Sequence, residues 1–131
     1  MGLPLTDAMQ KVLDGKNFAT IATISPDGGP QSSVVWVLRD GDKVLCSTQS
    51  TRQKARNLAA DPRVSLTMFD IANPYYSFEI RGTAELREDP DRSLPRRLSQ
   101  KYLGEDPPPE PDHVVRLIIS VTAEKITEFS P

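Results

Sequence analysis

The sequence lacks the residues and segments that several classes of protein require. It contains one cysteine, Cys46, and one histidine, His113. These numbers exclude an intrachain disulfide and a site with several cysteine ligands, and the isolated histidine argues against any bound metal. No apolar run approaches the roughly 20 residues that cross a bilayer, and the N-terminus lacks the basic-then-apolar order of a signal peptide. We therefore expect a cytosolic protein with no membrane attachment.

The chain also lacks an excess of positive charge. The formal net charge is −2 and the sequence pI about 5.4, so a protein that binds nucleic acid by neutralising phosphates is not expected. The chain has no Walker phosphate loop and no Gly-x-Ser-x-Gly elbow, and its carboxylates are dispersed without a pair suited to acid–base work. The sequence therefore names no catalytic side chain.

What the chain does have is a series of short periodic segments separated by proline and glycine. Its 131 residues are the size of one domain, 1–131, and its 12 prolines lie mainly between the periodic segments. Capping signals and hydrophobic spacing predict helices over 6–14, 50–61 and 90–102. Alternation and β-branched residues predict strands over 18–25, 31–40, 43–49, 63–70, 75–87 and 114–129.

Most of these strands are joined as hairpins, which makes them antiparallel. The expected fold is therefore mostly β, a six-stranded antiparallel barrel, open or split, with added helices. FATIATI (18–24) and VVWVL (34–38) carry apolar side chains on both faces, more than one small barrel can cover. We therefore expect a homodimer.

The segment 47–57 carries the clearest functional signal. A strand end, a hydroxyl-rich turn and a helix start follow one another there, and residues 50–64 hold a net charge of +3 in an acidic chain. Free N–H groups at a helix start favour an anion such as phosphate. The other interpretation is an ordinary capped helix with a solvated basic face. Arg52 and Lys54 can converge on one ligand only if Arg52 lies in the turn before the helix, because residues two apart point in opposite directions.

Laid end to end, these segments resemble the flavin/deazaflavin oxidoreductase superfamily, with the split barrel of pyridoxamine 5'-phosphate oxidase. The resemblance is closest to the actinobacterial branch of reductases that use the deazaflavin F420. It is carried by residues 34–68, 73–86 and 101–104 and by the final strand, and its most specific part is STxxxxxKxxNLxxDPR at 47–63 followed by EIRGTAEL.

The resemblance implies a homodimer with the cofactor at the subunit interface. It assigns the phosphate to Ser47, Thr48, Arg52 and Lys54. It also implies a ring that lies along the strand of Ser32, Ser33, Val34, Val35 and Trp36. It also places Asn57 near the cofactor. The substrate pocket that it implies contains Trp36, with Tyr75 and Phe78 contributed by the other subunit.

The activity that the resemblance implies is hydride transfer from reduced F420 to an electron-poor small molecule of the enone, quinone or lactone type, with the cofactor supplying the chemistry. F420 carries a lactyl-oligoglutamate tail beyond its phosphate. Two alternatives stay open: an FMN-dependent oxidase or reductase on the same fold, and a carrier protein that binds F420 or flavin without catalysis. Substrate selectivity is expected near Trp36 and in the loops 70–76 and 105–111.

Overall fold

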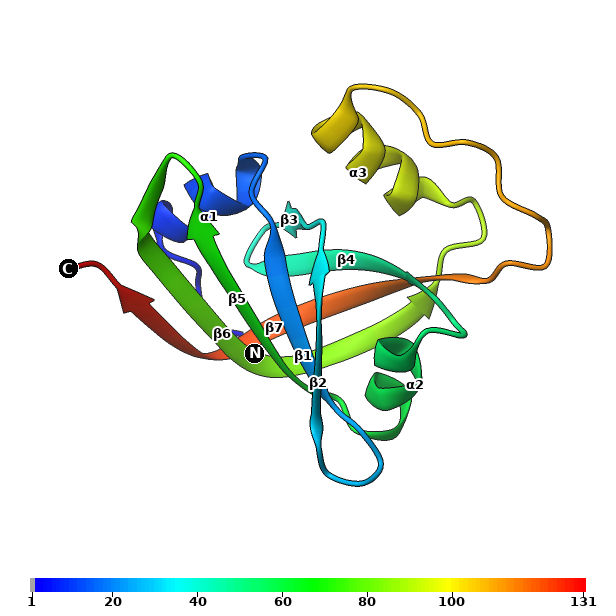
Figure 1. Cartoon of the computed structure of the whole chain (residues 1–131), viewed down its shortest axis with the longest axis horizontal. Coiled ribbons are helices and arrows are strands. Elements are labelled where there is room, and N and C mark those ends of the chain that lie inside the picture. Colours follow the sequence, from blue (N-terminus) through cyan, green and yellow to red (C-terminus); the bar gives the residue numbers. More distant parts are fainter. Residues whose placement is uncertain (1) are drawn as a thin grey trace.

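The structure is a computed structural model, and it describes residues 2–131. Three helices accompany one curved antiparallel sheet (Figure 1). The helices are α1 (Asp7–Asp14), α2 (Gln53–Ala60) and α3 (Ser93–Leu103). The strands are β1 (Ala19–Ile24), β2 (Pro30–Val35), β3 (Leu38–Asp40), β4 (Lys43–Gln49), β5 (Arg63–Asp70), β6 (Asn73–Glu88) and β7 (Arg116–Phe129).

The helix ends follow the local sequence signals. The hydroxyl of Thr6 accepts a hydrogen bond from the Met9 N–H and caps α1, as its position before an apolar stripe predicts. Gly104 ends α3, the last helix. Its backbone is in the left-handed region, with φ of 74°, which glycine adopts without steric strain. These two boundaries confirm the sequence-based predictions.

The strands form a seven-stranded sheet in the order β2-β1-β5-β6-β7-β4-β3, which confirms the antiparallel, unclosed architecture. The prediction of one strand over 31–40 is wrong, because this segment forms both β2 and β3. These two strands are the opposite edges of the sheet, paired with β1 and β4 respectively. The chain crosses the opening between the edges at residues 36–37, and this crossing marks the split of the barrel.

Side-chain hydrogen bonds explain the break between β2 and β3. The N–H of Val37 donates to the Tyr102 hydroxyl at 3.2 Å, and its carbonyl accepts from the ammonium of Lys101 at 2.7 Å. Both backbone groups are thus satisfied by α3 and not by a neighbouring strand. Sequence periodicity cannot detect this, because Val37 continues the apolar pattern of its neighbours.

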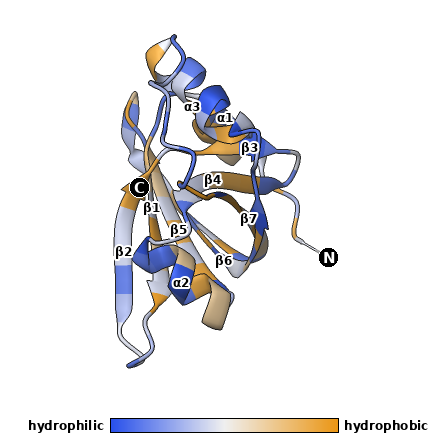
Figure 2. Ribbon diagram, turned by 90° about the vertical axis from the view of Figure 1, so that its right-hand side faces the viewer, coloured by the Kyte–Doolittle hydropathy of each residue, from blue (hydrophilic) through white to orange (hydrophobic). Residues whose placement is uncertain are grey.

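The core lies inside the curve of the sheet, where Figure 2 shows hydrophobic residues on β4 and on α1. Met9 and Leu13 of α1 pack there with Ile21, Leu66 and Ile119 of the sheet, and each is at most 1% exposed. A second cluster fixes α3 to the barrel. It consists of Leu45, Leu94, Leu98, Tyr102 and Ile118.

Replacing Tyr102 with phenylalanine should lower the free energy of unfolding by about 1–3 kcal/mol, since a buried donor and acceptor lose their partner. Its hydroxyl donates to the Asn17 carbonyl at 2.6 Å and accepts from the Val37 N–H. Urea unfolding measures the change. Tyr75→Phe is the matched control, because Tyr75 is 71% exposed within one subunit and phenylalanine keeps the ring that a second copy would cover. It should stay within about 0.5 kcal/mol of the parent. Equal effects of the two substitutions would refute the stabilising role of this hydroxyl.

Lys101 predicts a pH dependence. Its ammonium is half-buried against the Leu13 and Val37 carbonyls, and desolvation lowers its pKa to about 8, partly opposed by Asp14. Between pH 8 and 10 the unfolded chain therefore binds more protons at this residue than the folded one, so the free energy of unfolding rises with pH. Because the side chain is only half-buried, we expect about 1 kcal/mol. The stability difference between the parent and Lys101→Met should increase by that amount from pH 8 to 10; a constant difference would contradict the prediction.

Candidate functional site

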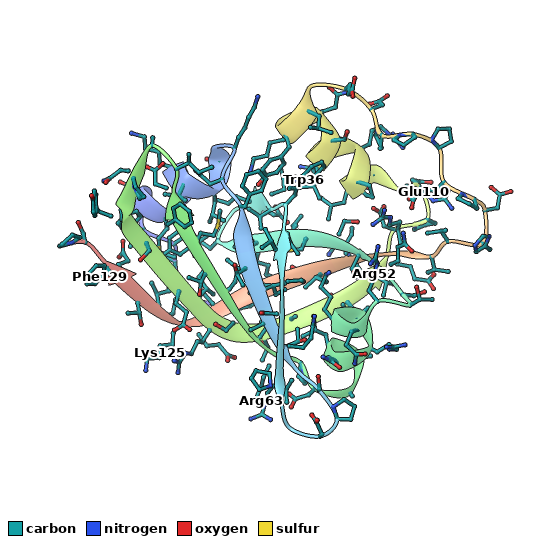
Figure 3. All side chains as sticks on the ribbon, viewed as in Figure 1. Trp36, Arg52, Arg63, Glu110, Lys125 and Phe129 are labelled. Atoms are coloured by element: carbon teal, nitrogen blue, oxygen red, sulfur yellow. The ribbon has the colours of Figure 1, made fainter. Side chains whose placement is uncertain are left out.

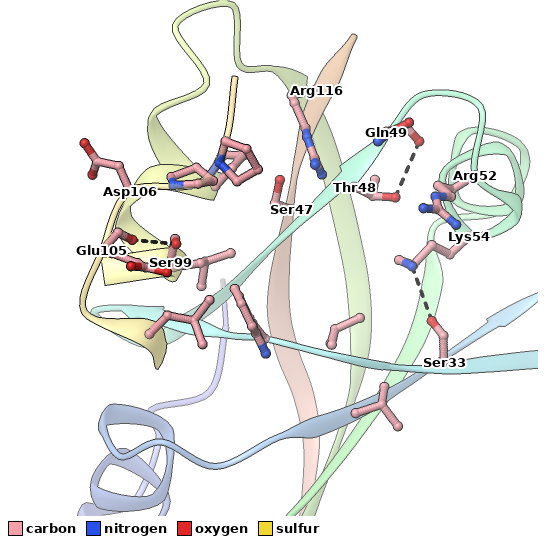
Figure 4. Close-up of a pocket in the computed structure, with 18 residues that line it drawn as sticks. Ser33, Ser47, Thr48, Gln49, Arg52, Lys54, Ser99, Glu105, Asp106 and Arg116 are labelled. Atoms are coloured by element: carbon pink, nitrogen blue, oxygen red, sulfur yellow. Dashed lines mark hydrogen bonds between the residues drawn. The ribbon is translucent and has the colours of Figure 1, made fainter. Parts of the chain in front are cut away.

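A cavity of about 600 Å³ opens at the split of the barrel, between the β2 edge, the end of β4, and the helices α2 and α3 (Figure 4). Figure 3 shows Trp36, Arg52 and Glu110 on this side of the molecule, away from Phe129. The cavity is lined by Ser33, Val34, Val35, Trp36, Ser47, Thr48, Gln49, Arg52, Lys54, Pro95, Leu98, Ser99, Leu103, Glu105, Asp106, Pro107, Pro108 and Arg116.

One end of the cavity gathers hydroxyls and cations, and we call Ser47, Thr48, Arg52 and Lys54 its anion end. Arg52 precedes α2 with extended backbone, φ −72° and ψ 150°, while Lys54 lies in the first turn of the helix. The change from extended to helical backbone between them lets both side chains line one cavity, although they are two residues apart. The structure thus confirms that Arg52 lies in the turn before the helix, which is the condition for Arg52 and Lys54 to line the same cavity.

Two groups of the anion end have hydrogen-bonding capacity that an anionic ligand could use. The ammonium of Lys54 donates only a long hydrogen bond, 3.3 Å, to the Ser33 hydroxyl, and burial followed by the nearby charge of Arg52 lowers its pKa. The hydroxyl oxygen of Ser47 is buried and has no hydrogen-bond partner among residues 2–131. A buried polar atom without a partner is costly, so these groups are arranged to gain from a bound oxyanion.

The middle of the cavity has an aromatic and aliphatic wall. The Trp36 indole stacks on Tyr102 with ring centroids 5.0 Å apart and an interplanar angle of 11°, and Phe18 stacks on Tyr102 at 5.5 Å. Leu98 and Leu103 of α3 continue this wall. Such a surface suits a flat, largely apolar ligand that is oriented by polar groups at one end.

The far wall consists of residues 105–108, which we call the loop wall. It is attached to α3, since the Ser99 hydroxyl donates to the Glu105 carbonyl at 2.6 Å and the Gln100 amide donates to the Asp106 carboxylate at 2.7 Å. The loop wall belongs to the proline-rich segment in which the sequence placed substrate selectivity. The other expected loop, 70–76, does not line the cavity of this chain.

Most of the predicted cofactor residues line the cavity, whereas Ser32 and Asn57 do not. Tyr75 and Phe78, which are expected from the other subunit, do not line the cavity of their own chain either. Ser32 alternates away from Ser33 on β2, and Tyr75 is 71% exposed on β6. Asn57 is 1% exposed, where its amide donates to the Thr23 hydroxyl and attaches α2 to β1. Phe78 is 2% exposed within the core, so we no longer assign it to the substrate pocket.

Sequence reasoning missed the residues that tertiary structure brings to the cavity from afar. Arg116 is the most important, because it adds a cation beside Gln49, its partner in the β4–β7 register. Gln49, Pro95, Leu98, Ser99 and Leu103 were also missed. For Arg116 the only available signal was the expected pairing of strands. This pairing cannot be derived from the sequence spacing, because Gln49 and Arg116 are 67 residues apart.

The cavity offers binding groups and no evident catalytic group. Cys46 lies behind it, fully buried, and burial raises the pKa of its thiol to about 12. Among residues 2–131 no cluster of three or more His, Cys, Asp or Glu side chains is placed to hold a metal ion, and no helix in that range is long and apolar enough to cross a membrane.

Comparison with known proteins agrees with this geometry. A solved structure described as an F420 reductase has a TM-score of 0.85 and 31% identity, and the match covers 94% of this chain and 98% of that one. A conserved hypothetical protein from Mycobacterium tuberculosis has a TM-score of 0.78 at 23% identity, over 96% and 85% of the two chains, and supports the fold alone.

A curated pyridoxine/pyridoxamine 5'-phosphate oxidase from Kineococcus radiotolerans is 29% identical over 102 residues, which is 78% of this chain. The match spans only 42% of the length of that relative. The sequence profile of the pyridoxamine 5'-phosphate oxidase family matches residues 5–130, nearly the whole chain. The chain therefore belongs to the pyridoxamine 5'-phosphate oxidase family and has its split-barrel fold.

Proposed function

We propose that the protein is a reductase that uses reduced F420 to deliver a hydride to an electron-poor small molecule of the enone, quinone or lactone type. The observation that carries this proposal is the anion end, where Ser47, whose buried hydroxyl has no hydrogen-bond partner among the described residues, lines the same cavity as Arg52 and Lys54. The similarity to an F420 reductase at 31% identity supports the deazaflavin over other cofactors.

The residues present fit such a cofactor. Ser47, Thr48, Arg52 and Lys54 would hold its phosphate, and the β2 backbone from Ser33 to Val35 would run beside its ring. When bound, the reduced deazaflavin supplies the hydride. Trp36, held by its stacking on Tyr102, would form one wall for the substrate and exclude water from it.

The proposal is tested by titrating the purified protein with F420 and, separately, with FMN, following fluorescence quenching. We expect saturable binding of F420 and turnover of its reduced form with members of a quinone and enone panel. Tight binding of FMN without binding of F420 would overturn the proposal in favour of an FMN-dependent oxidase or reductase. That second function is favoured by the family itself and by a phosphate site that suits FMN equally well.

A carrier function is the alternative from another class, and it rests on the absence of an evident catalytic side chain among the described residues that line the cavity. A carrier would bind F420 but would not transfer its hydride to any substrate in the panel. Turnover at a rate above that of free reduced F420 would refute it.

We also expect a symmetric homodimer whose cofactor site is shared between the subunits. Val34 is 70% exposed on the edge strand β2, and Phe69, Ile71 and Tyr75 at the β5–β6 hairpin are at least 50% exposed, which is apolar surface that a second copy would cover. Light scattering should give twice the mass of the chain. A stable monomer at micromolar concentration that binds the cofactor fully would contradict both parts of this expectation.

A further inference from the structure

One cationic side chain of the cavity, Arg116, is already paired with a carboxylate of the same chain, Glu110. The guanidinium of Arg116 lines the cavity beside the anion end, and it donates two hydrogen bonds to Glu110, from Nε at 2.9 Å and from Nη2 at 3.0 Å. This fork-to-fork geometry is the one that guanidinium groups use for carboxylates and phosphates of ligands. Figure 4 shows Arg116 between Gln49 and the segment that carries the loop wall.

The pair is only partly withdrawn from water. The Arg116 and Glu110 side chains are 22% and 20% exposed, and the guanidinium holds the pKa of Glu110 below its usual range, so the carboxylate is charged at neutral pH. An ion pair at this depth can exchange one anion for another, because neither charge would be left buried and alone.

A second cation can keep Glu110 after such an exchange. Arg92 Nε lies 3.9 Å from the Glu110 carboxylate. The Arg92 guanidinium also donates to the carbonyls of Pro111 at 2.9 Å and Val114 at 3.1 Å, so this end of the proline-rich segment is held through its backbone. The Glu110 side chain can therefore leave Arg116 while the segment remains in place.

We propose that Arg116 is a second anion-binding position of the cavity and that Glu110 is its built-in competitor. A ligand whose phosphate lies at the anion end, and which carries a further carboxylate or phosphate, displaces Glu110 from Arg116 and takes its place. A ligand with the phosphate alone leaves the Arg116–Glu110 pair intact. This inference rests on the proposed function and assigns Arg116 to the selection of cofactors with an anionic extension.

The test compares two forms of F420, one with a tail of several glutamates and one without glutamates, by fluorescence titration. The measured quantity is the ratio of their dissociation constants. Glu110→Gln should raise the preference for the tailed form by at least about fivefold, because the competitor loses its charge. Arg116→Gln should lower it by at least about fivefold, and the double variant should equal Arg116→Gln, since without Arg116 there is nothing to compete for.

A purely structural pair gives a different result. If Glu110→Gln and Arg116→Gln weaken both forms by the same factor, the pair only holds the cavity wall and the inference is refuted. If neither form binds to the parent protein, the proposed function fails as well, so the two failures are distinguished. Should Arg116→Gln not fold, Arg116→Lys serves in its place, because lysine keeps the charge but cannot form two parallel hydrogen bonds to one carboxylate. It should lower the preference for the tailed form by at least about twofold. An unchanged preference refutes the inference.

Discussion

Gly82→Ala is expected to destabilise the protein by about 3 kcal/mol or more, the upper part of the range for overpacking. Gly82 follows a register shift in β6, where the long β6–β7 pairing is irregular. A Cβ added there would lie 1.8 Å from the Thr122 carbonyl oxygen and 2.9 Å from its carbon. These are backbone atoms of a central strand, so relief requires the two longest strands to separate. Urea unfolding measures the loss.

Gly41→Ala distinguishes this clash from the general cost of replacing a glycine. Gly41 has φ of 60° in the turn between β3 and β4. Apart from its two chain neighbours, no described residue has an atom within 4 Å of its added Cβ. It should cost about 1–2 kcal/mol, the conformational penalty of the left-handed region. If Gly82→Ala destabilises the protein less than Gly41→Ala does, the close approach of β6 and β7 is relieved at little cost and the argument fails.

The sequence predicts local structure well where a local cause determines it. The cap at Thr6 and the stop at Gly104 depend on hydrogen bonds and backbone angles within a few residues, and both lie where expected. The break between β2 and β3 at Val37 has no local cause. It is caused by two side chains of α3 that lie 64 and 65 residues later in the chain. A tertiary contact of this kind overrides an uninterrupted strand pattern.

The same division applies to the candidate site. Arg52 and Lys54 were found from local charge and a helix start, and both line the cavity. Arg116 could not be found in this way, since its place beside Gln49 depends on the β4–β7 register. Phe78 was assigned to the pocket by family resemblance and is buried in the core, because its position on β6 alternates inward.

Lys54→Ala should weaken cofactor binding by about 1.5–3 kcal/mol, the usual range for a charge-assisted hydrogen bond, or about 10- to 150-fold in dissociation constant. The ammonium is half-buried at the anion end, and its one hydrogen bond to the described part of the chain is the long contact to the Ser33 hydroxyl. A phosphate would therefore gain a strong partner at little cost to existing contacts. Because Lys54 would contact the phosphate and not the reacting ring, turnover at saturating cofactor should fall much less than affinity.

Arg56→Ala is the matched control, because it removes the same charge from the same helix. Its guanidinium donates to Gln53 on the exposed side of α2 and does not line the cavity. It should change the dissociation constant by less than about twofold, since exposed charges are screened. Neither variant should change thermal stability without cofactor by more than about 0.5 kcal/mol.

Equal losses of affinity in the two variants would mean that α2 attracts the cofactor only through its overall charge. Unchanged affinity in Lys54→Ala would show that the phosphate binds elsewhere, and the basic helix would then be an ordinary solvated one.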